Sequence, residues 1–337
     1  MPHSHSQVQG RLGVAASSAL TRRVTMMSLA VATILIVLKF IAWAESGSVA
    51  VLASLADSSL DFLASLLTFY AVRYAAAPPD AEHRFGHGKA EAFASLVQAG
   101  LVFASAALIG QEAVRRILAP QPIQGEAWGM GVMVASVVLT SGLIVVQSQV
   151  LKRTGSVAVS GDRAHYASDL ASNVVAFIGI GAAALFDRPI FDAAAGLAVA
   201  AWLVWGAIQV FREASLQLMD HELGDEARAH IVDLTLADGR IKGVHQLRTR
   251  ASGPMIHMQM HADLDPGMTL IEAHQAMVAA ERRLLEAFPA ADIIIHPDPR
   301  GRAEPHGGPF AGPEHDEDDD TEHGAEHRSE HTGPVSR

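Results

Sequence analysis

Six apolar runs of about 20 residues or more fill most of the first two thirds of this 337-residue chain. A helix rises about 1.5 Å per residue, so 20 apolar residues cross the roughly 30 Å hydrocarbon core of a bilayer. The runs are Val24–Trp43, Val49–Tyr74, Ala92–Leu118, Trp128–Leu151, Ala164–Phe186 and Ile190–Phe211. This pattern predicts a membrane protein with six transmembrane α-helices.

Positive residues gather on one side of these runs. They are Arg11, Arg22, Arg23, Arg73, Arg84, Lys89, Lys152, Arg153, Arg163 and Arg212. Because lysine and arginine favour the cytoplasmic side, we expect both termini in the cytoplasm. Arg115 and Arg116 lie on the other side, where their long side chains can reach the interface.

The N-terminus has a second interpretation, since Arg22 and Arg23 precede an apolar stretch that ends in an Ala-x-Ala pattern at Ala42–Ala44. Such a pattern is also typical of a signal peptide. The stretch is too long for a usual h-region, and the topology needs it as a span. The chain has no cysteine, so a metal site would use histidine and carboxylate ligands.

After Arg212 the sequence takes the pattern of a small soluble domain that ends near Arg300. We expect a helix Asp225–Leu236, followed by strands Val244–Arg250 and Ile256–Leu264. A second helix begins at a capping box formed by Thr269 and Glu272 and ends at Phe288, and a last strand covers Ala291–His296. The order αββαβ predicts a ferredoxin-like α+β domain with two helices on one sheet face.

The predicted divisions are a cytoplasmic segment (1–21), a transport domain (22–212), a metal-binding dimerisation domain (213–300) and a disordered tail (301–337). The tail from Ala303 onward holds ten acids and two arginines, so it supplies −8 of the net charge of −11. Nothing in this balance indicates nucleic-acid binding. The tail histidines are His306, His315, His323, His327 and His331, which either collect metal ions loosely or stay solvated.

Two pairs of polar residues lie inside the apolar runs, Asp57 with Asp61 and His165 with Asp169. Each pair has i, i+4 spacing and so shares one helix face. A carboxylate near the bilayer centre costs roughly 2.5 to 3.5 kcal/mol, so it needs an ion, a proton or water. We predict that these four residues form a tetrahedral site for a divalent metal such as zinc, for which protons compete. The alternative is plain interhelical hydrogen bonding.

Two further groups of candidate ligands lie outside the apolar runs. Asp80, His83 and His87 have spacings that can converge on one ion, although a solvated polar loop fits equally well. The soluble domain carries His245, His261, His274, His296 and Asp298 at strand ends or helix starts. The alternation of the second strand places His261 on the open sheet face. We interpret His257, on that same face, as an ordinary surface residue.

Several motifs carry a resemblance to a known family. They are LADSSLDFLAS around Asp57, PDAEHRFGHGKAEAFASL around His83, GDRAHYASDLASN around His165, LMDHEL near Asp220, and HQLRTRASGP followed by IIIHPDP. In this order they resemble the cation diffusion facilitators, and within them the bacterial ferrous-iron and zinc efflux branch, from about residue 20 to residue 300.

The resemblance implies a homodimer in the bacterial inner membrane that exports a divalent cation in exchange for protons. Zn²⁺ is the expected substrate and structural ion, with Fe²⁺ or Cd²⁺ as further substrates. The implied sites are the quartet for transport, the loop group, and a paired-metal site of His245, His261, His296 and Asp298 to which His274 contributes. Lys89 and Asp220 match positions that the family uses for charge pairing at the dimer interface.

Two other functions fit parts of the sequence. An intramembrane zinc protease would need a motif such as His-Glu-x-x-His, which does not occur in the sequence. A paired-aspartate protease should take its acids from two helices, whereas Asp57 and Asp61 share one. A metal sensor or assembly scaffold that does not transport would be expected to lack intramembrane ligands, and all four are present.

Overall fold

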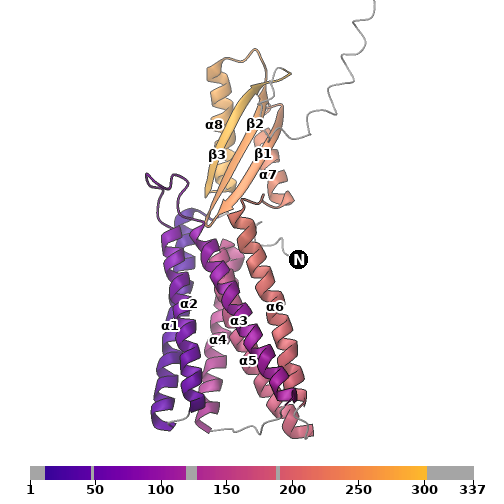
Figure 1. Cartoon of the computed structure of the whole chain (residues 1–337). Coiled ribbons are helices and arrows are strands. Elements are labelled where there is room, and N and C mark those ends of the chain that lie inside the picture. Colours follow the sequence, from indigo (N-terminus) through magenta and orange to yellow (C-terminus); the bar gives the residue numbers. More distant parts are fainter. Residues whose placement is uncertain (1–11, 47–48, 119–126, 187–189, 302–337) are drawn as a thin grey trace, which may run out of the picture.

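The computed structural model describes residues 12–46, 49–118, 127–186 and 190–301. Figure 1 shows two parts, a bundle of long helices and a smaller unit of helices and strands at one end of it. The predictions for the first 11 residues, and for a disordered tail with its histidines beyond residue 301, fall outside the described residues.

The bundle consists of long helices that follow the predicted apolar runs. They are α1 (Val14–Ser46), α2 (Val49–Ala75), α3 (Ala90–Leu118), α4 (Ala127–Thr154), α5 (Val157–Phe186) and α6 (Ile190–Leu218). Each helix is longer than the apolar run predicted for it. The largest extensions belong to α1, α5 and α6, because polar turns at the end nearest the smaller unit continue each helix.

Over the part of the chain that the structure describes, five helices are long and apolar enough to cross a membrane. The segments are Val14–Glu45, Ser54–Ala75, Ala90–Arg115, Val134–Thr154 and Ala194–Leu218. Exposed side chains such as Leu63, Leu108 and Trp205 cover the outside of the bundle, which suits contact with lipid rather than water. Because α5 is not among the five segments, the sixth span stays a prediction.

Small and polar side chains set the packing inside the bundle. α3 packs along α6, where Ala106 and Ala207 let the two helices approach closely. In the interior, Asp162 of α5 accepts hydrogen bonds from Ser28 Oγ of α1 at 2.6 Å and from Gln147 Nε2 of α4 at 2.8 Å. This junction fixes α5 against two of its neighbours.

The smaller unit has the predicted element order. Its elements are α7 (Asp225–Leu236), β1 (Gly243–Ser252), β2 (Met255–Leu264), α8 (Leu270–Ala287) and β3 (Ala291–Pro299). The capping box that opens α8 is formed as predicted. Thr269 Oγ1 accepts from the backbone N–H of Glu272, and the Glu272 carboxylate accepts from the backbone N–H of Thr269. The five elements are therefore confirmed to within a few residues at their ends.

The sheet is mixed, with β2 in the middle, antiparallel to β1 and parallel to β3. Ile256, Met258 and Met260 of β2 are buried beneath α7 and α8. The alternate residues of β2, including His261, lie on the other face because side chains alternate along a strand. The helices therefore cover one face and leave the histidine face open. The ferredoxin-like classification stays a prediction.

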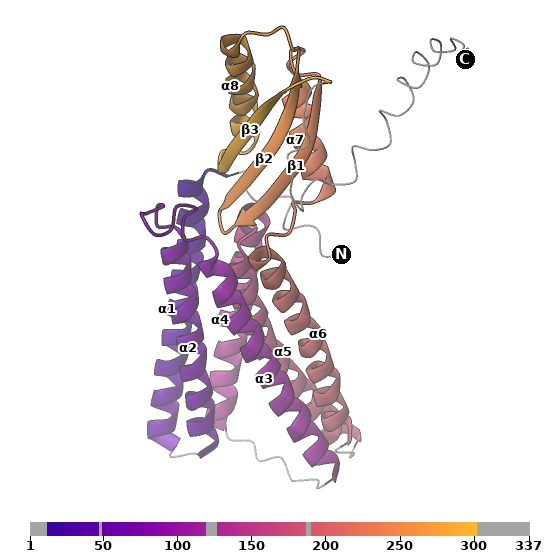
Figure 2. The ribbon, with the colours of Figure 1, turned by 45° about the horizontal axis from the view of Figure 1, so that its top comes forward.

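The α+β unit stands on the end of the bundle (Figure 2). The loop between α2 and α3 meets the turn between β1 and β2, where a Cβ added to Gly88 would lie 2.1 Å from the carbonyl oxygen of Ser252. A glycine is therefore needed for this close approach. From the same loop, the Phe85 ring lies 5.7 Å from the His257 ring and 4.8 Å from the guanidinium of Arg250.

Candidate metal centres

Three members of the predicted quartet converge between α2 and α5. We name Asp61, His165 and Asp169 the intramembrane cluster. His165 Nε2 lies 3.1 Å from Asp61 Oδ1 and 3.8 Å from Asp169 Oδ2, and the three ligand atoms lie within 4.8 Å of one another. Ligand atoms that bind Zn²⁺ tetrahedrally at about 2.0 to 2.1 Å lie about 3.3 Å apart. Small side-chain shifts would therefore let this cluster hold a divalent ion.

The fourth member, Asp57, is not part of this convergence. It lies one turn before Asp61 on α2, and its side chain is exposed. The described structure thus brings together three of the four predicted ligands. The role of Asp57 as a ligand stays a prediction.

Neighbouring polar groups support the intramembrane cluster. Tyr166 Oη lies 2.8 Å from Ser65 Oγ, which joins α5 to α2 beside the cluster. The Nδ1 atom of His165 is buried and has no hydrogen-bond partner among the described residues. Lys39 of α1 donates to Ser58 Oγ at 2.5 Å, and its charge interacts with the carboxylates of α2 and α5. The sequence prediction missed this lysine, although a cation inside the first apolar run was a signal.

The loop between α2 and α3 brings its three candidate ligands together. We name Asp80, His83 and His87 the loop cluster. The two oxygens of Asp80 lie 3.2 Å from His83 Nδ1 and 3.2 Å from His87 Nε2. His87 is buried against Tyr74, with ring centroids 4.4 Å apart, whereas Asp80 and His83 are exposed. The loop cluster is therefore open to solvent on one side.

Local hydrogen bonds keep the Asp80 carboxylate ready to bind a cation. The backbone N–H of His83 donates to Asp80 Oδ1 at 2.6 Å, and that of Glu82 donates at 2.9 Å. These bonds, led by the one from His83, hold the pKa of Asp80 below its usual value. Gly86 completes the turn with a positive φ of 78°.

Three histidines form a row across the sheet. His245 of β1 pairs in register with His261 of β2, which pairs with His296 of β3. Asp298 Oδ2 lies 2.8 Å from His261 Nδ1 and 3.4 Å from His245 Nε2, while its Oδ1 lies 2.9 Å from His296 Nδ1. We name His245, His261 and Asp298 the sheet cluster, because their ligand atoms lie within 4.8 Å of one another. His296 lies at its exposed edge.

Asp298 is the anchor of the sheet cluster. Its side chain is buried, and burial alone acts to raise its pKa. The hydrogen bond with His261 and the nearby histidine charges outweigh burial, so the pKa of Asp298 lies below its usual value. The carboxylate is therefore charged at neutral pH, as a metal ligand must be.

Two protein-family models match this chain. The cation efflux transmembrane domain matches residues 25–219, which is more than half of the chain, and the cation efflux protein cytoplasmic domain matches residues 223–300. The chain belongs to the cation efflux family.

Named relatives agree with this assignment. The cation-efflux pump FieF of Cronobacter sakazakii is 36% identical over 280 residues, which is 83% of this chain and 93% of the relative. The pump of the same name from Serratia proteamaculans is also 36% identical over 280 residues, with the same coverage of both chains. A solved structure of CzrB in its Zn form is 32% identical to this chain, matches 26% of this chain and 99% of its own length, and has a TM-score of 0.24. The resemblance to the cation diffusion facilitators is confirmed.

This cation efflux protein is thus a multi-pass membrane transporter with a cytoplasmic domain built on a small mixed sheet. Its relatives are named as efflux pumps, as expected of a protein that is not an enzyme.

Lys89 and Asp220 form an ion pair within one chain of the cation efflux protein. Lys89 Nζ lies 2.9 Å from Asp220 Oδ1, and Arg250 Nη1 lies 3.2 Å from Asp220 Oδ2. Although burial acts to raise it, the hydrogen bond from Lys89 and the charge of Arg250 bring the pKa of Asp220 below its usual value. These contacts join the residue just before α3, the segment just after α6 and β1. Pairing across a dimer interface stays a prediction.

The sheet cluster differs from the predicted ligand set at two positions. His274 lies on an exposed part of α8 and does not join the converging ligand atoms, so its role stays a prediction. Asp263 was missed, and its Oδ1 lies 3.4 Å from His245 Nε2. Because Asp263 follows His261 by two residues on β2, strand alternation was a signal that placed both on one face.

The interpretation of His257 as a surface residue was wrong. Its side chain is buried, and its Nδ1 lies 3.0 Å from Asp292 Oδ2. The face was assigned correctly, but Phe85 of the membrane-domain loop covers it there. This contact joins residues far apart in the sequence, so strand alternation alone gave no sign of it.

Proposed function

We propose that this cation efflux protein exports a divalent metal ion from the cytoplasm in exchange for protons. Zn²⁺ is the first candidate substrate, and Fe²⁺ and Cd²⁺ are further candidates because the same ligands suit them. The observation that carries the proposal is the convergence of Asp61, His165 and Asp169 from two helices of the bundle, α2 and α5.

The chemistry of the intramembrane cluster supports exchange rather than permanent binding. Carboxylates inside a membrane need a compensating charge, which a metal ion or protons supply. Both bind the same lone pairs, so each displaces the other. Metal would load from the cytoplasm, and protons would displace it at the outer side as the helices change access. Asp57, one turn away on α2, would complete four ligands when the ion is bound.

The positive flanks support an orientation with both termini in the cytoplasm and six spans, in the bacterial inner membrane. On this topology, residues 1–21 form a cytoplasmic segment, 22–212 the transport domain, 213–300 the cytoplasmic metal-binding domain and 301–337 the tail. The loop cluster and the sheet cluster then both face cytosolic metal.

We assign the sheet cluster a structural and regulatory role. Two histidines and a carboxylate suit Zn²⁺. His296 and Asp263 lie next to them, where each can serve as a further ligand or as a hydrogen-bond partner of a ligand. Homologous cytoplasmic domains form a dimerisation unit, so we propose that this chain acts as a homodimer whose assembly responds to zinc. We also propose that His274 contributes to the metal site of the cytoplasmic domain, and that Lys89 and Asp220 form a charge pair at the dimer interface.

The test is uptake of Zn²⁺ into proteoliposomes that contain the full chain, under an imposed pH gradient. We compare the wild type with Asp61→Ala and with the control Asp225→Ala, since Asp225 is a fully exposed acid on α7. Gradient-dependent uptake in the wild type and the control, and its loss in Asp61→Ala, is the expected result. Zinc uptake that does not depend on the pH gradient would contradict proton exchange.

The alternative function is a membrane metal sensor or assembly scaffold that does not transport. It predicts zinc binding to the cytoplasmic domain with no flux in any variant. If Zn²⁺ gives no uptake, the same vesicles are tested with Fe²⁺, Cd²⁺ and Mn²⁺. If none of the four ions is taken up, the transport proposal is overturned in favour of the sensor or scaffold.

A further inference from the structure

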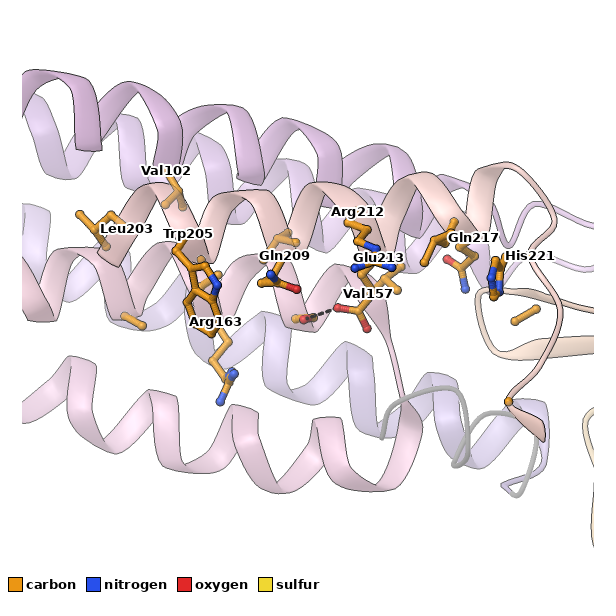
Figure 3. Close-up of a pocket in the computed structure, with 18 of the residues that line it drawn as sticks. Val102, Val157, Arg163, Leu203, Trp205, Gln209, Arg212, Glu213, Gln217 and His221 are labelled. Carbon is orange, nitrogen blue, oxygen red and sulfur yellow. Dashed lines mark hydrogen bonds between the residues drawn. The ribbon is translucent and has the colours of Figure 1, made fainter. Parts of the chain in front are cut away.

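A cavity of about 650 Å³ lies between α5 and α6, bounded by α3 and by the segment that leads into the cytoplasmic domain (Figure 3). Its lining includes Arg163, Trp202, Trp205, Arg212 and Gln217. We name this cavity the α5–α6 groove. It lies beside α6 at the end of the bundle nearest the cytoplasmic domain.

The α5–α6 groove is separate from the intramembrane cluster. On α5 it is lined by Val157, Ser160, Ala164 and Ala167, which recur at the spacing of one helix face. Successive residues of an α-helix are turned by about 100°, so His165 points away from this face. The groove is therefore not the entrance to the intramembrane cluster, and its polar groups need another explanation.

The groove changes character along its length. Trp202, Leu203 and Trp205 line its deeper part, where the exposed indole rings present an apolar surface. Arg212 and Gln217 of α6, and His221 just after its end, follow toward the cytoplasmic domain, as Figure 3 shows. An apolar part next to a polar, cationic part matches an amphiphile with a tail and a headgroup.

Several polar groups in the groove have no partner. Gln217 is only 7% exposed, yet both its amide nitrogen and its amide oxygen lack hydrogen bonds. Arg163 donates from Nη1 to Ser148 Oγ at 3.2 Å, while its Nε is buried without a partner. Within the described residues neither Arg163 nor Arg212 makes an ion pair with a carboxylate. Buried donors without partners are costly and indicate a missing ligand or water.

The two acids at the groove are already engaged. Glu213 accepts a hydrogen bond from Ser160 Oγ at 3.1 Å, the dashed contact in Figure 3. Glu222 accepts from the backbone N–H of Thr249 at 2.8 Å and lies 3.7 Å from Arg228 Nε. The arginines of the groove therefore remain available to an outside anion.

We propose that the α5–α6 groove binds one anionic phospholipid, with Arg163 and Arg212 as the cationic groups that attract its headgroup, Gln217 as a hydrogen-bond partner of the headgroup and an acyl chain along Trp202 and Trp205. Arginine is the residue that best matches phosphate oxygens, and basic pockets between membrane helices recognise lipid headgroups. The membrane surrounds this part of the chain, so a lipid reaches the groove without a further opening. The bound lipid fills the space between α5 and α6 where α6 leads into the cytoplasmic domain.

Native mass spectrometry of the full chain in detergent tests this proposal. Phosphatidylglycerol is titrated against phosphatidylcholine with the wild type, the double variant R163Q/R212Q and the control K152Q/R153Q. The control removes the same charge from the exposed end of α4. We expect the first double variant to bind phosphatidylglycerol about 30-fold more weakly, from two lost cationic contacts, and the control to bind it unchanged.

Gln217→Leu provides a second variant that keeps every charge. It should also weaken phosphatidylglycerol binding, with a thermal unfolding profile like that of the wild type. Equal losses in both double variants would mean that general surface charge attracts the lipid, and would overturn the proposal. Displacement of the lipid by millimolar inorganic phosphate would indicate a free-anion site and would also overturn the proposal. The same holds if the variants lose the mass peak of the dimer and keep that of the bound lipid, because a second copy would then cover the groove.

Discussion

The intramembrane cluster and the sheet cluster use the same ligand types but are held in different ways. His245 and His261 sit on neighbouring strands whose register is fixed by backbone hydrogen bonds, and Asp298 is buried between them. Asp61 and His165 sit on two helices, each of which keeps its backbone hydrogen bonds to itself. Moving a strand register breaks several backbone bonds, whereas two packed helices can slide past each other.

This difference shows how one set of ligands can serve two tasks. A site that releases its ion must change its geometry at low cost, and two helices joined by side chains allow that. A site that holds a domain in shape must resist change, and three strands in register provide that. The intramembrane cluster therefore suits a transported ion and the sheet cluster a resident one.

The largest effect is expected from the acid of α5. Asp169→Asn removes a charged ligand whose oxygen lies 3.8 Å from His165 Nε2, so zinc uptake into proteoliposomes should fall to the level of protein-free vesicles. Asp57→Asn removes the proposed fourth ligand, which is exposed in this structure, so zinc uptake should also fall to the level of protein-free vesicles. Uptake that stays at the wild-type rate in Asp57→Asn would remove Asp57 from the transport site.

The next effect concerns the anchor of the sheet cluster. Zinc at 100 times its dissociation constant should slow hydrogen exchange of the β1–β3 amides by about 100-fold in the wild type, because it stabilises only the folded sheet. Asp298→Ala should abolish this slowing, since three histidines contact that carboxylate. Asp233→Ala, at an exposed position of α7, should behave as the wild type. Zinc protection that survives in Asp298→Ala would remove Asp298 from the site.

A smaller effect should follow from a crowded glycine. A Cβ on Gly243 would lie 2.4 Å from Asp263 Oδ2, so Gly243→Ala must push that carboxylate away from His245. We expect zinc affinity of the sheet cluster to fall about tenfold, as for the loss of a partner outside the main ligands. Gly239→Ala is the control, because its Cβ would meet nothing within 4 Å. Equal zinc titrations for the two variants would exclude Asp263 from the site.

The smallest effect concerns the turn that leads into β1. Arg240 Nη2 lies 2.6 Å from Asp238 Oδ2, and its hydrogen bonds lower the pKa of Asp238 to about 2. A lowered pKa stabilises the fold at pH values above the ordinary 3.8, and this contribution is lost as the pH falls toward about 2. Asp238→Asn should therefore destabilise the cytoplasmic domain by about 1 kcal/mol at pH 7, after allowance for solvent screening.

Hydrogen exchange of the β1 amides measures this difference at pH 7 and again near pH 3. The difference in unfolding free energy between the wild type and Asp238→Asn should become smaller at the lower pH. A difference that is the same at both pH values would mean that Asp238 acts through its shape rather than its charge.

Local signals in the sequence predicted the cytoplasmic domain well. The capping box at Thr269, the turn before Met255 and the alternation along β2 each depend on neighbours in the chain, and the structure has all three. The spacing of Asp80, His83 and His87 allowed their convergence but fitted a solvated loop equally well, and the structure brings the three together within one loop.

Contacts between distant parts of the chain were harder to predict. Phe85 covers His257 only because the loop between α2 and α3 docks on the sheet, which no local pattern encodes. The exposed position of Asp57 depends on how α2 rotates against α5, which i, i+4 spacing leaves open. The α5–α6 groove likewise arises from helix packing. In the sequence, its arginines indicated only which side of the membrane the helix ends face.

The assignment of transport to the intramembrane cluster is tested most directly by comparing His165→Ala with His261→Ala in one assay. Both variants remove a buried or half-buried imidazole that touches an aspartate, at 3.1 Å in the membrane and at 2.8 Å in the sheet. Initial rates of zinc uptake into proteoliposomes are measured under a fixed pH gradient at saturating zinc. We expect His165→Ala to abolish zinc uptake and His261→Ala to maintain it at a reduced rate. Uptake that survives His165→Ala would contradict the assignment of transport to the intramembrane cluster.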